Sequence, residues 1–339
     1  MGSVSETFTG EEADARSSPR PERWRSAVAW TVAGCWGVWA AARLVAVDRL
    51  PGLGMPAIPL ISFTPYVAAT AAVPVACAAI LRHRWALLAS ALVAAALVAP
   101  MLPRAMAGGQ PAAQGPTVRV LTANLLFGQA RPERVLQLVR RHDVDVLSLQ
   151  ELTPQAVAGL EAAGLTRLLP YKVIDPRTGA AGTGLYARHP LRALPAPPGT
   201  VMAMPRAEFS LPGGRTVEVT AVHPPPPISR AAVRHWRHDL RALPSSSGGR
   251  DGRVRILAGD YNATLDHAHL RRVLSRGYAD AADRTGGGLI PTWGVSAGAR
   301  TPLTIDHILV DRRCAVRDLK VYDIAGSDHR AVFADVRLP

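Results

Sequence analysis

The sequence predicts an α/β protein with two packed β-sheets that carry helices on their outer faces, preceded by about three transmembrane helices. Three observations support this prediction. From residue 117 onward, short runs rich in Val, Leu and Ile alternate with helical patterns. Before that point lie three long apolar stretches, and a linker of Gly, Pro, Gln and Ala at 105–116 separates the two parts. Groups of strands followed by helices are typical of two packed sheets with helices outside.

The N-terminal part has the composition of a tail followed by a membrane region. Residues 1–25 are polar and poor in large apolar side chains, which predicts a disordered tail. The apolar stretches are 27–47, 57–81 and 85–103, each near the ~20 residues that a helix needs to cross a bilayer. A signal peptide followed by a buried hairpin is the alternative, but a signal peptide has a single short apolar core. We therefore assign 26–104 to a transmembrane region.

The distribution of arginine predicts the orientation of this region. Cytoplasmic loops carry an excess of basic residues. Arginines precede the first apolar stretch, and Arg82 and Arg84 separate the second from the third. With the N-terminus inside, three crossings place residues 117–339 outside, so we expect a multi-pass protein of the cell membrane with an extracytoplasmic domain. If the third stretch, which two prolines shorten, does not span the bilayer, the domain faces the cytoplasm.

Charge and cysteine content exclude few functions. The net charge of +13 suits anionic lipid head groups and phosphorylated substrates, and it equally suits nucleic acid. Cys35 and Cys77 lie in predicted spans and Cys314 is alone in the C-terminal part. This part therefore has no internal disulfide, and it has no Cys/His spacing typical of a zinc site.

The C-terminal part divides into nine expected strands and four expected helices. The strands are at 118–126, 145–152, 183–187, 207–211, 216–223, 254–262, 304–310, 316–322 and 331–338. The helices are at 132–142, 154–163, 229–243 and 266–275. Thr153 suits the N-cap of the second helix, with Pro154 in its first turn, and Thr264 or Asp266 is available to cap the fourth.

Six short polar patches lie at the ends of strand-like runs. They read TANLL, SLQEL, VTAVHP, LAGDYNA, TIDHILV and GSDHR. Each places an acid, an amide or an imidazole beside apolar residues, where such groups are costly to desolvate unless they are paired or bind a metal. Together they predict one site, and its residue types suit metal-assisted hydrolysis of a phosphate ester or anhydride.

In this order, the patches resemble the motifs of the endonuclease/exonuclease/phosphatase (DNase I-like) superfamily, over about residues 117–339. The segment from Pro291-Thr292-Trp293 to His307 also resembles the stretch before the last motif of that superfamily. The resemblance implies a four-layer α/β sandwich with its active site where the motif-bearing strands end. With the predicted spans added, the arrangement resembles the membrane-anchored VanJ-type teicoplanin-resistance proteins.

The resemblance also implies roles for individual residues. The metal ligands would be Glu151, Asn124 and Asp328, with Mg²⁺ as the ion and Mn²⁺ as the alternative. Leu126 stands where some relatives carry an Asp, which leaves the number of metal ions open.

The remaining patches supply the catalytic residues that the resemblance implies. Asp260 would place or deprotonate the attacking water, and Asn262 and His223 would contact phosphoryl oxygens. Asp306 and His329 suit a carboxylate–imidazole pair, in which the acid fixes the tautomer and favours the imidazolium.

Four other polar positions are expected to stay outside the chemistry. His307 neighbours Asp306 on a strand and so faces the opposite way. Ser327 has no activating base at a suitable spacing. His235 and His238 accompany several arginines on a helix, which indicates a solvated basic face.

Together these features predict a membrane-anchored, metal-dependent phosphohydrolase. We expect direct water attack on a lipid-linked, undecaprenyl pyrophosphate substrate, with a link to glycopeptide (teicoplanin) resistance. A membrane-tethered nuclease and a phospholipase or sphingomyelinase-like phosphodiesterase are the alternatives within the same chemistry. Nucleic acid is the less favoured partner, because few aromatic residues are available to stack on a strand. An inactive membrane scaffold is the alternative of another class.

Overall fold

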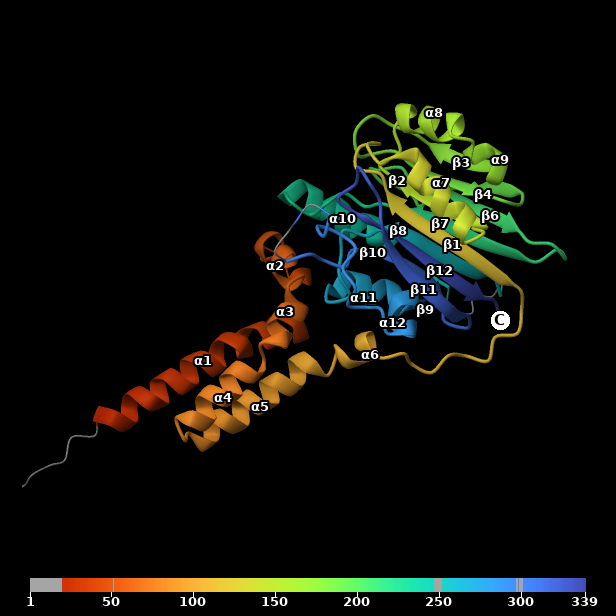
Figure 1. The fold of residues 1–339 in the computed structure, drawn as a ribbon. Helices are drawn as coiled ribbons and strands as arrows, with labels where there is room; N and C mark the ends of the chain where they lie inside the picture. The colour runs from red at the N-terminus through yellow and green to blue at the C-terminus, as the bar shows by residue number, and fades with distance from the viewer. Residues whose placement is uncertain (1–19, 51, 247–251, 297, 299–300) are drawn as a thin grey trace, which may run out of the picture.

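The computed structural model describes residues 20–50, 52–246, 252–296, 298 and 301–339. It consists of a β-sandwich and a group of N-terminal helices that projects from one side of it (Figure 1). The predicted tail lies mostly outside the described residues. The first helix, however, begins at Arg20, inside the segment 1–25 that was assigned to the tail.

Two six-stranded sheets form the sandwich. The first has the order β11-β12-β1-β2-β4-β3, with β1 (Thr117–Asn124), β2 (Val146–Gln150), β3 (Tyr171–Asp175), β4 (Thr183–Ala187), β11 (Ala315–Asp323) and β12 (Arg330–Arg337). The second has the order β5-β6-β7-β8-β10-β9, with β5 (Leu191–Leu194), β6 (Arg206–Ser210), β7 (Thr216–Val222), β8 (Val254–Asp260), β9 (Tyr278–Asp280) and β10 (Asp306–Asp311). In each sheet one central pair is parallel, β1 with β2 and β7 with β8.

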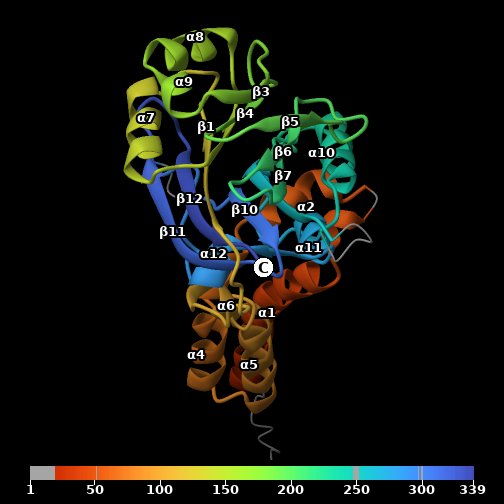
Figure 2. The same ribbon diagram turned by 90° about the vertical axis from the view of Figure 1, so that its right-hand side faces the viewer.

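Helices cover the outer face of each sheet (Figure 2). On the first sheet these are α7 (Pro132–Arg141), α8 (Pro154–Ala162) and α9 (Leu165–Leu168); on the second they are α10 (Arg230–Ala242) and α11 (Ala268–Leu274), with α12 (Ala281–Thr285) after β9. One apolar core fills the space between the sheets, with Val120 and Phe209 from opposite sides. A second core joins the first sheet to its helices, and a third core joins the second sheet to its helices. The predicted two-sheet α/β sandwich is confirmed.

Within the described residues, every predicted strand and helix of this part is present, with shifted ends. Three strands were not predicted: β3, β5 and β9. They are short, and β3 and β5 are the outermost strands of their sheets, with side chains largely open to solvent. Such strands need no alternation of apolar and polar residues, so the sequence carries little signal for them.

The caps of the helices follow the sequence only in part. Thr153 caps α8 by accepting a hydrogen bond from the Ala156 backbone N–H at 3.1 Å. The predicted cap of α11 is wrong, because its N-cap is His267 without a side-chain cap bond. The carboxylate of Asp266 is engaged elsewhere, with two arginines of the N-terminal region.

The N-terminal region contains more breaks than the apolar stretches suggested. Its elements are α1 (Arg20–Leu44), η1 (Val47–Arg49), α2 (Gly54–Ile61), α3 (Thr64–Ala69), α4 (Ala72–Ile80), α5 (Arg84–Val98) and α6 (Leu102–Ala105). The second stretch is thus three helices. Pro65 stands in the first turn of α3, where its missing N–H and fixed φ favour a new helix over continuation of α2.

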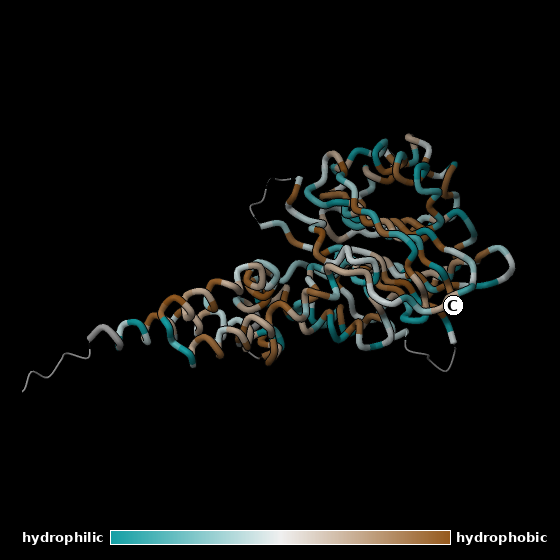
Figure 3. Tube along the Cα trace, turned by 60° about the horizontal axis from the view of Figure 1, so that its bottom comes forward, coloured by the Kyte–Doolittle hydropathy of each residue, from teal (hydrophilic) through white to brown (hydrophobic). Residues whose placement is uncertain are grey.

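Length and hydropathy do not single out a membrane-spanning helix among the described residues. The segments Met55–Ile61 and Thr64–Ile80 meet the criteria only as a pair, with a bend of 51° between them. Most of these helices are apolar along their length (Figure 3). The three predicted spans therefore remain a prediction.

A buried ion-pair cluster fastens the N-terminal helices to the sandwich. Asp266, whose side chain is fully buried, accepts hydrogen bonds from Arg43 Nε at 2.7 Å and from Arg104 Nη1 at 2.8 Å. Burial by itself would raise the pKa of Asp266, but Arg104 and Arg43 outweigh it and lower the pKa. Nearby, Asp48 Oδ2 accepts a hydrogen bond from the Ala268 backbone N–H at 2.8 Å.

We expect Asp266→Ala to destabilise the protein by about 3–5 kcal/mol, because it leaves two largely buried guanidinium groups without their carboxylate. Denaturant unfolding of the detergent-solubilised protein measures this. Glu161→Ala, which breaks a half-exposed pair with Lys172, is the control and should cost less than about 1 kcal/mol. Equal losses in the two variants would show that the Asp266 cluster does not stabilise the fold.

Candidate active site

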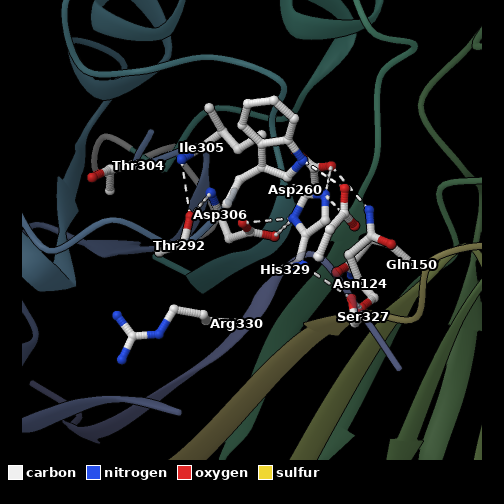
Figure 4. A network of polar contacts seen from close by, with 12 residues as sticks. Asn124, Gln150, Asp260, Thr292, Thr304, Ile305, Asp306, Ser327, His329 and Arg330 are labelled. Carbon is white, nitrogen blue, oxygen red and sulfur yellow. Dashed lines mark hydrogen bonds and ion pairs between the residues drawn. The ribbon is translucent and has the colours of Figure 1, made fainter. Parts of the chain in front are cut away.

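The polar strand ends meet at one end of the sandwich. In the first sheet Asn124 at the end of β1 lies opposite Gln150 at the end of β2. In the second sheet Asp260 at the end of β8 lies opposite Asp306 at the start of β10. The two sheets face each other, so these four positions converge although they are far apart in the sequence (Figure 4).

Asp260 is at the centre of the site. Its carboxylate is 2% exposed and accepts hydrogen bonds from Asn124 Nδ2 at 3.1 Å and from the Asn262 backbone N–H at 2.8 Å. Two imidazole nitrogens flank it, His223 Nε2 at 3.7 Å and His329 Nε2 at 3.8 Å. Burial and the Asp306 carboxylate raise the pKa of Asp260, which the two histidines partly oppose.

Glu151 lies beside Asp260 and is joined to it through one amide. Asn124 Nδ2 donates to Glu151 Oε1 at 3.1 Å as well as to Asp260. The other oxygen of Glu151 accepts a hydrogen bond from the Phe127 backbone N–H at 2.6 Å. The amide oxygen of Asn124 accepts one from the Leu126 backbone N–H at 3.0 Å. The Asn124 side chain therefore holds both acids and the turn after β1 in a fixed arrangement.

The Asp306 and His329 side chains form a close pair. His329 Nδ1 lies 2.9 Å and 3.1 Å from the two Asp306 oxygens. The Asp306 backbone N–H donates to Thr292 Oγ1 at 3.0 Å, which anchors the acid. Burial by itself would lower the pKa of His329, but Asp306, Asp260 and Asp328 outweigh it and raise the pKa to about 10. His329 is therefore an imidazolium at neutral pH.

His223 has the opposite electrostatic character. It is 1% exposed, and burial lowers its pKa even though Asp260 acts in the other direction. A neutral imidazole and a protonated one thus stand on either side of the same carboxylate. Titratable groups whose environments separate their pKa values in this way are typical of acid–base sites.

Backbone strain is concentrated at this site. Glu151 and Asn262 have φ values of 56° and 47°, and Leu126 and Phe127 have 45° and 51°. Left-handed backbone costs non-glycine residues about 1–3 kcal/mol each and is common at functional sites. Here it turns the chain directly after β1, β2 and β8, where the polar side chains must face a common space.

The site opens into a cavity of about 490 Å³. Its polar lining includes Glu151, His223, Asp260, Asn262, Asp328 and His329. Asn262 Nδ2 donates to the Pro224 carbonyl at 3.0 Å, so this amide also ties the proline-rich segment after β7 to the cavity edge. A shallower groove adjoins the cavity and shares Leu126 and Asp328 with it.

The donor set fits a hard divalent cation, which prefers carboxylate and amide oxygens. Asp328 Oδ2 accepts a hydrogen bond from Trp293 Nε1 at 2.9 Å. Its Oδ1 is buried, has no hydrogen-bond partner among the described residues, and lies 3.9 Å from His329 Nε2. Among the described residues, Asp260, Asp306 and His329 form a group that could hold a metal ion, with one donor atom of each within 4.8 Å of the others. Glu151 lies beside this group, joined through Asn124.

His307 contributes to the site indirectly. It faces away from the cavity, but it is buried and bonded on both ring nitrogens, to Asp280 Oδ2 at 2.7 Å and to the Ala263 carbonyl at 2.9 Å. Burial would lower the pKa of His307, but Asp280 outweighs it and raises the pKa. We predicted that His307 takes no part in the site. It stays outside the cavity, but together with Asp280 it holds the carbonyl of Ala263, the residue after Asn262.

The remaining predicted exclusions fit the geometry. Ser327 Oγ donates to the Asn124 carbonyl at 2.8 Å and accepts from the His329 backbone N–H at 3.0 Å, so it orients the last motif. His238 on α10 lies 3.1 Å from the Pro198 carbonyl, outside the cavity lining. Sequence reasoning missed the parts of Trp293 and Thr292 in the site, although the Pro291-Thr292-Trp293 segment had been singled out.

The raised pKa of His329 predicts a pH dependence of stability in the metal-free protein. Because the folded state keeps this proton above the ordinary pKa of 6.5, the stabilisation is complete below pH 6.5 and is lost as the pH rises through about 10. Replacing His329 by Gln should remove that decline. Melting temperatures of both proteins in EDTA, measured from neutral to alkaline pH, provide the comparison. Parallel curves would contradict the assignment of the imidazolium.

Comparison with known proteins identifies relatives of this fold. The model of the endonuclease/exonuclease/phosphatase family matches residues 121–329. The endonuclease/exonuclease/phosphatase from Beutenbergia cavernae is 20% identical, with a TM-score of 0.50, over 66% of this chain and 72% of that one. The corresponding protein from Bacteroides vulgatus is 19% identical, with a TM-score of 0.52, over 66% and 100%. A humanized TDP2 of D. rerio is 18% identical, with a TM-score of 0.51, over 65% and 98%. Among curated proteins no significant match is found.

Proposed function

The chain belongs to the endonuclease/exonuclease/phosphatase family, and we propose that it is a membrane-anchored phosphohydrolase that removes phosphate from a lipid-linked pyrophosphate. The observation that carries this proposal is the position of Asp260. Its carboxylate lies 3.7 Å from His223 Nε2 and 3.8 Å from His329 Nε2 and lines a cavity of about 490 Å³. Such a site can place a water molecule and stabilise charge on a phosphoryl group at the same time.

The reaction we propose is direct attack of water on phosphorus, without a covalent enzyme intermediate. Asp260 would hold the water and accept its proton, and its raised pKa suits a general base. The His329 imidazolium, kept charged by Asp306, would bind a phosphoryl oxygen and stabilise the charge that develops on it. Neutral His223 and the Asn262 amide would contact the remaining oxygens.

A metal ion would add to this electrostatic stabilisation. Glu151 and Asp328 are the residues we propose to hold Mg²⁺, or Mn²⁺ in its place. Asn124, which the sequence also assigned to the metal, turns its Nδ2 toward Glu151 and Asp260 and its Oδ1 toward the Leu126 backbone N–H, so it would position Glu151. When bound, such an ion supplies Lewis-acid polarisation of a phosphoryl oxygen.

The lipid-linked substrate rests on the N-terminal half of the chain. Apolar helices precede the sandwich, and part of them lines the same cavity as Asp260. With the domain outside the cytoplasm, as the arginine distribution predicts, undecaprenyl pyrophosphate is the substrate we favour, with a link to teicoplanin resistance. The net charge of +13 suits a pyrophosphate at an anionic membrane surface.

We expect the full-length protein in detergent with Mg²⁺ to release phosphate from undecaprenyl pyrophosphate. EDTA and His329→Ala should each reduce the release to background, and added Mg²⁺ should restore only the EDTA-treated wild type. Phosphate release is measured directly, beside cleavage of a DNA duplex and of sphingomyelin by the same preparation. No release from a folded, metal-loaded protein would rule out this substrate, and cleavage of either alternative would identify a nuclease or a phosphodiesterase instead.

A further inference from the structure

The lining of the cavity at Asp260 is chemically mixed. Besides the polar groups, it contains apolar residues from two sources. Ile58, Pro59 and Phe63 come from α2 and the turn after it. Pro227 is the last residue of the proline-rich segment 224–227 after β7, and Ile228 follows it. We propose, on the premise of the proposed function, that this apolar wall is the subsite for the hydrocarbon chain of the substrate. The N-terminal region would then determine substrate specificity in addition to anchoring the protein.

The wall is fixed relative to the catalytic groups. Ile58 is 1% exposed and belongs to the same core as Trp236 and Tyr261, the residue between Asp260 and Asn262. His267 Nε2 lies 2.9 Å from the Ile58 carbonyl, and its Nδ1 accepts a hydrogen bond from the Thr264 backbone N–H at 2.9 Å. Nε2 must therefore carry the proton and donate a hydrogen bond to the Ile58 carbonyl. This hydrogen bond ties α2 to the loop after β8.

The buried cluster at Asp266 reinforces this attachment one residue before His267. Arg43 from α1 and Arg104 from α6 both reach Asp266, so helices on either side of α2 in the sequence are held at the same loop. A wall whose helix and neighbouring helices are attached by buried bonds can present a constant apolar surface to a ligand. A loosely attached segment would instead be expected to shift with each substrate.

The chemistry of the wall points to a hydrocarbon occupant. None of its five residues carries a charge, and they line the same cavity as the acids. At the mouth, Ile228 is 76% exposed and Phe127 is 51% exposed. Exposed apolar side chains that cluster beside a polar site mark a binding surface. A chain attached to the reacting phosphate is the occupant that contacts both kinds of residue at once. After α2 the chain runs on into α3, α4 and α5, which project from the sandwich (Figure 1).

The experiment compares two substrates with the same reacting group and different chains. Farnesyl diphosphate and dimethylallyl diphosphate are hydrolysed by the full-length protein in mixed micelles of fixed composition, and kcat/KM is measured for each. We expect the wild type to favour the longer chain. Phe63→Ser and Ile228→Ser should each lower kcat/KM for farnesyl diphosphate by about tenfold, as expected for lost apolar contacts in a pocket. The value for dimethylallyl diphosphate should change by less than about twofold, since its short chain makes few contacts with the wall.

Two controls keep the outcomes separate. Leu60→Ser removes an exposed apolar side chain of α2 that does not line the cavity, and it should leave both substrates unaffected. Because Ile228 is largely exposed, its substitution is not expected to disturb folding. Equal losses on both substrates, or no loss on the longer one, would overturn the chain subsite and leave the phosphohydrolase activity intact. Failure of the wild type to hydrolyse either diphosphate would overturn the proposed function itself.

Discussion

Replacing Asp260 by asparagine is expected to lower kcat by about 10²–10⁴-fold, the range typical of a lost general base. The substitution keeps the size of the side chain, but its single oxygen can accept only one of the two hydrogen bonds that the Asp260 oxygens accept, from Asn124 Nδ2 and from the Asn262 backbone N–H. It removes the negative charge that faces His223 and His329 and the site that takes the proton from water. KM should change much less than kcat, because the groups that contact phosphate remain.

The measurement is steady-state phosphate release at saturating Mg²⁺, with circular dichroism to verify the fold. Asp311→Asn is the matched control. Asp311 ends the strand that Asp306 begins, is buried and pairs with Arg313, but lies outside the cavity lining. Its substitution should lower stability and leave kcat unchanged. An Asp260→Asn variant with wild-type kcat would exclude this carboxylate as the base.

Replacing Glu151 by glutamine is expected to weaken metal binding and to lower the rate at ordinary Mg²⁺ by about 10²–10³-fold, as for the loss of one electrostatic partner in an active site. The amide side chain fits the same space. The backbone of residue 151 is left-handed, with φ 56°, and glutamine adds no strain to it beyond that of glutamate. It retains one oxygen that can accept the hydrogen bond from the Phe127 backbone N–H. The charge that attracts a divalent cation is lost.

Two readouts separate metal binding from structural damage. Mn²⁺ binding, followed by electron paramagnetic resonance, should weaken in Glu151→Gln, and activity should recover partly as Mg²⁺ is raised. Glu208→Gln, which replaces a largely buried glutamate of β6 paired with Arg192, should change neither. Unaltered Mn²⁺ binding in Glu151→Gln would transfer the ligand role to other acids, with Asp260 and Asp306 as the first candidates.

The sequence alone determined most of the strands and helices of the C-terminal part, but not the short strands β3, β5 and β9. Runs of Val, Leu and Ile mark strands buried in a sandwich, and Thr153 before Pro154 marks the start of a helix. It also selected the polar residues that converge at the site, because acids, amides and imidazoles at the ends of buried strands are costly without partners. These signals depend only on residues that are neighbours in the sequence, so the sequence alone reveals them.

Only the tertiary structure decided which of these residues meet. Asn124 contacts Asp260 across 136 positions of the chain, and Arg43 contacts Asp266 across 223. The cap predicted for α11 failed because Asp266 was engaged by these distant arginines, and His307 acquired its role from Asp280 on the neighbouring strand β9. The apolar wall from α2 likewise depends on how the N-terminal helices pack against the sandwich. Local sequence encodes burial and helix ends. Strand register and helix docking depend on the packing of the whole chain, and they determine which side chains share a cavity.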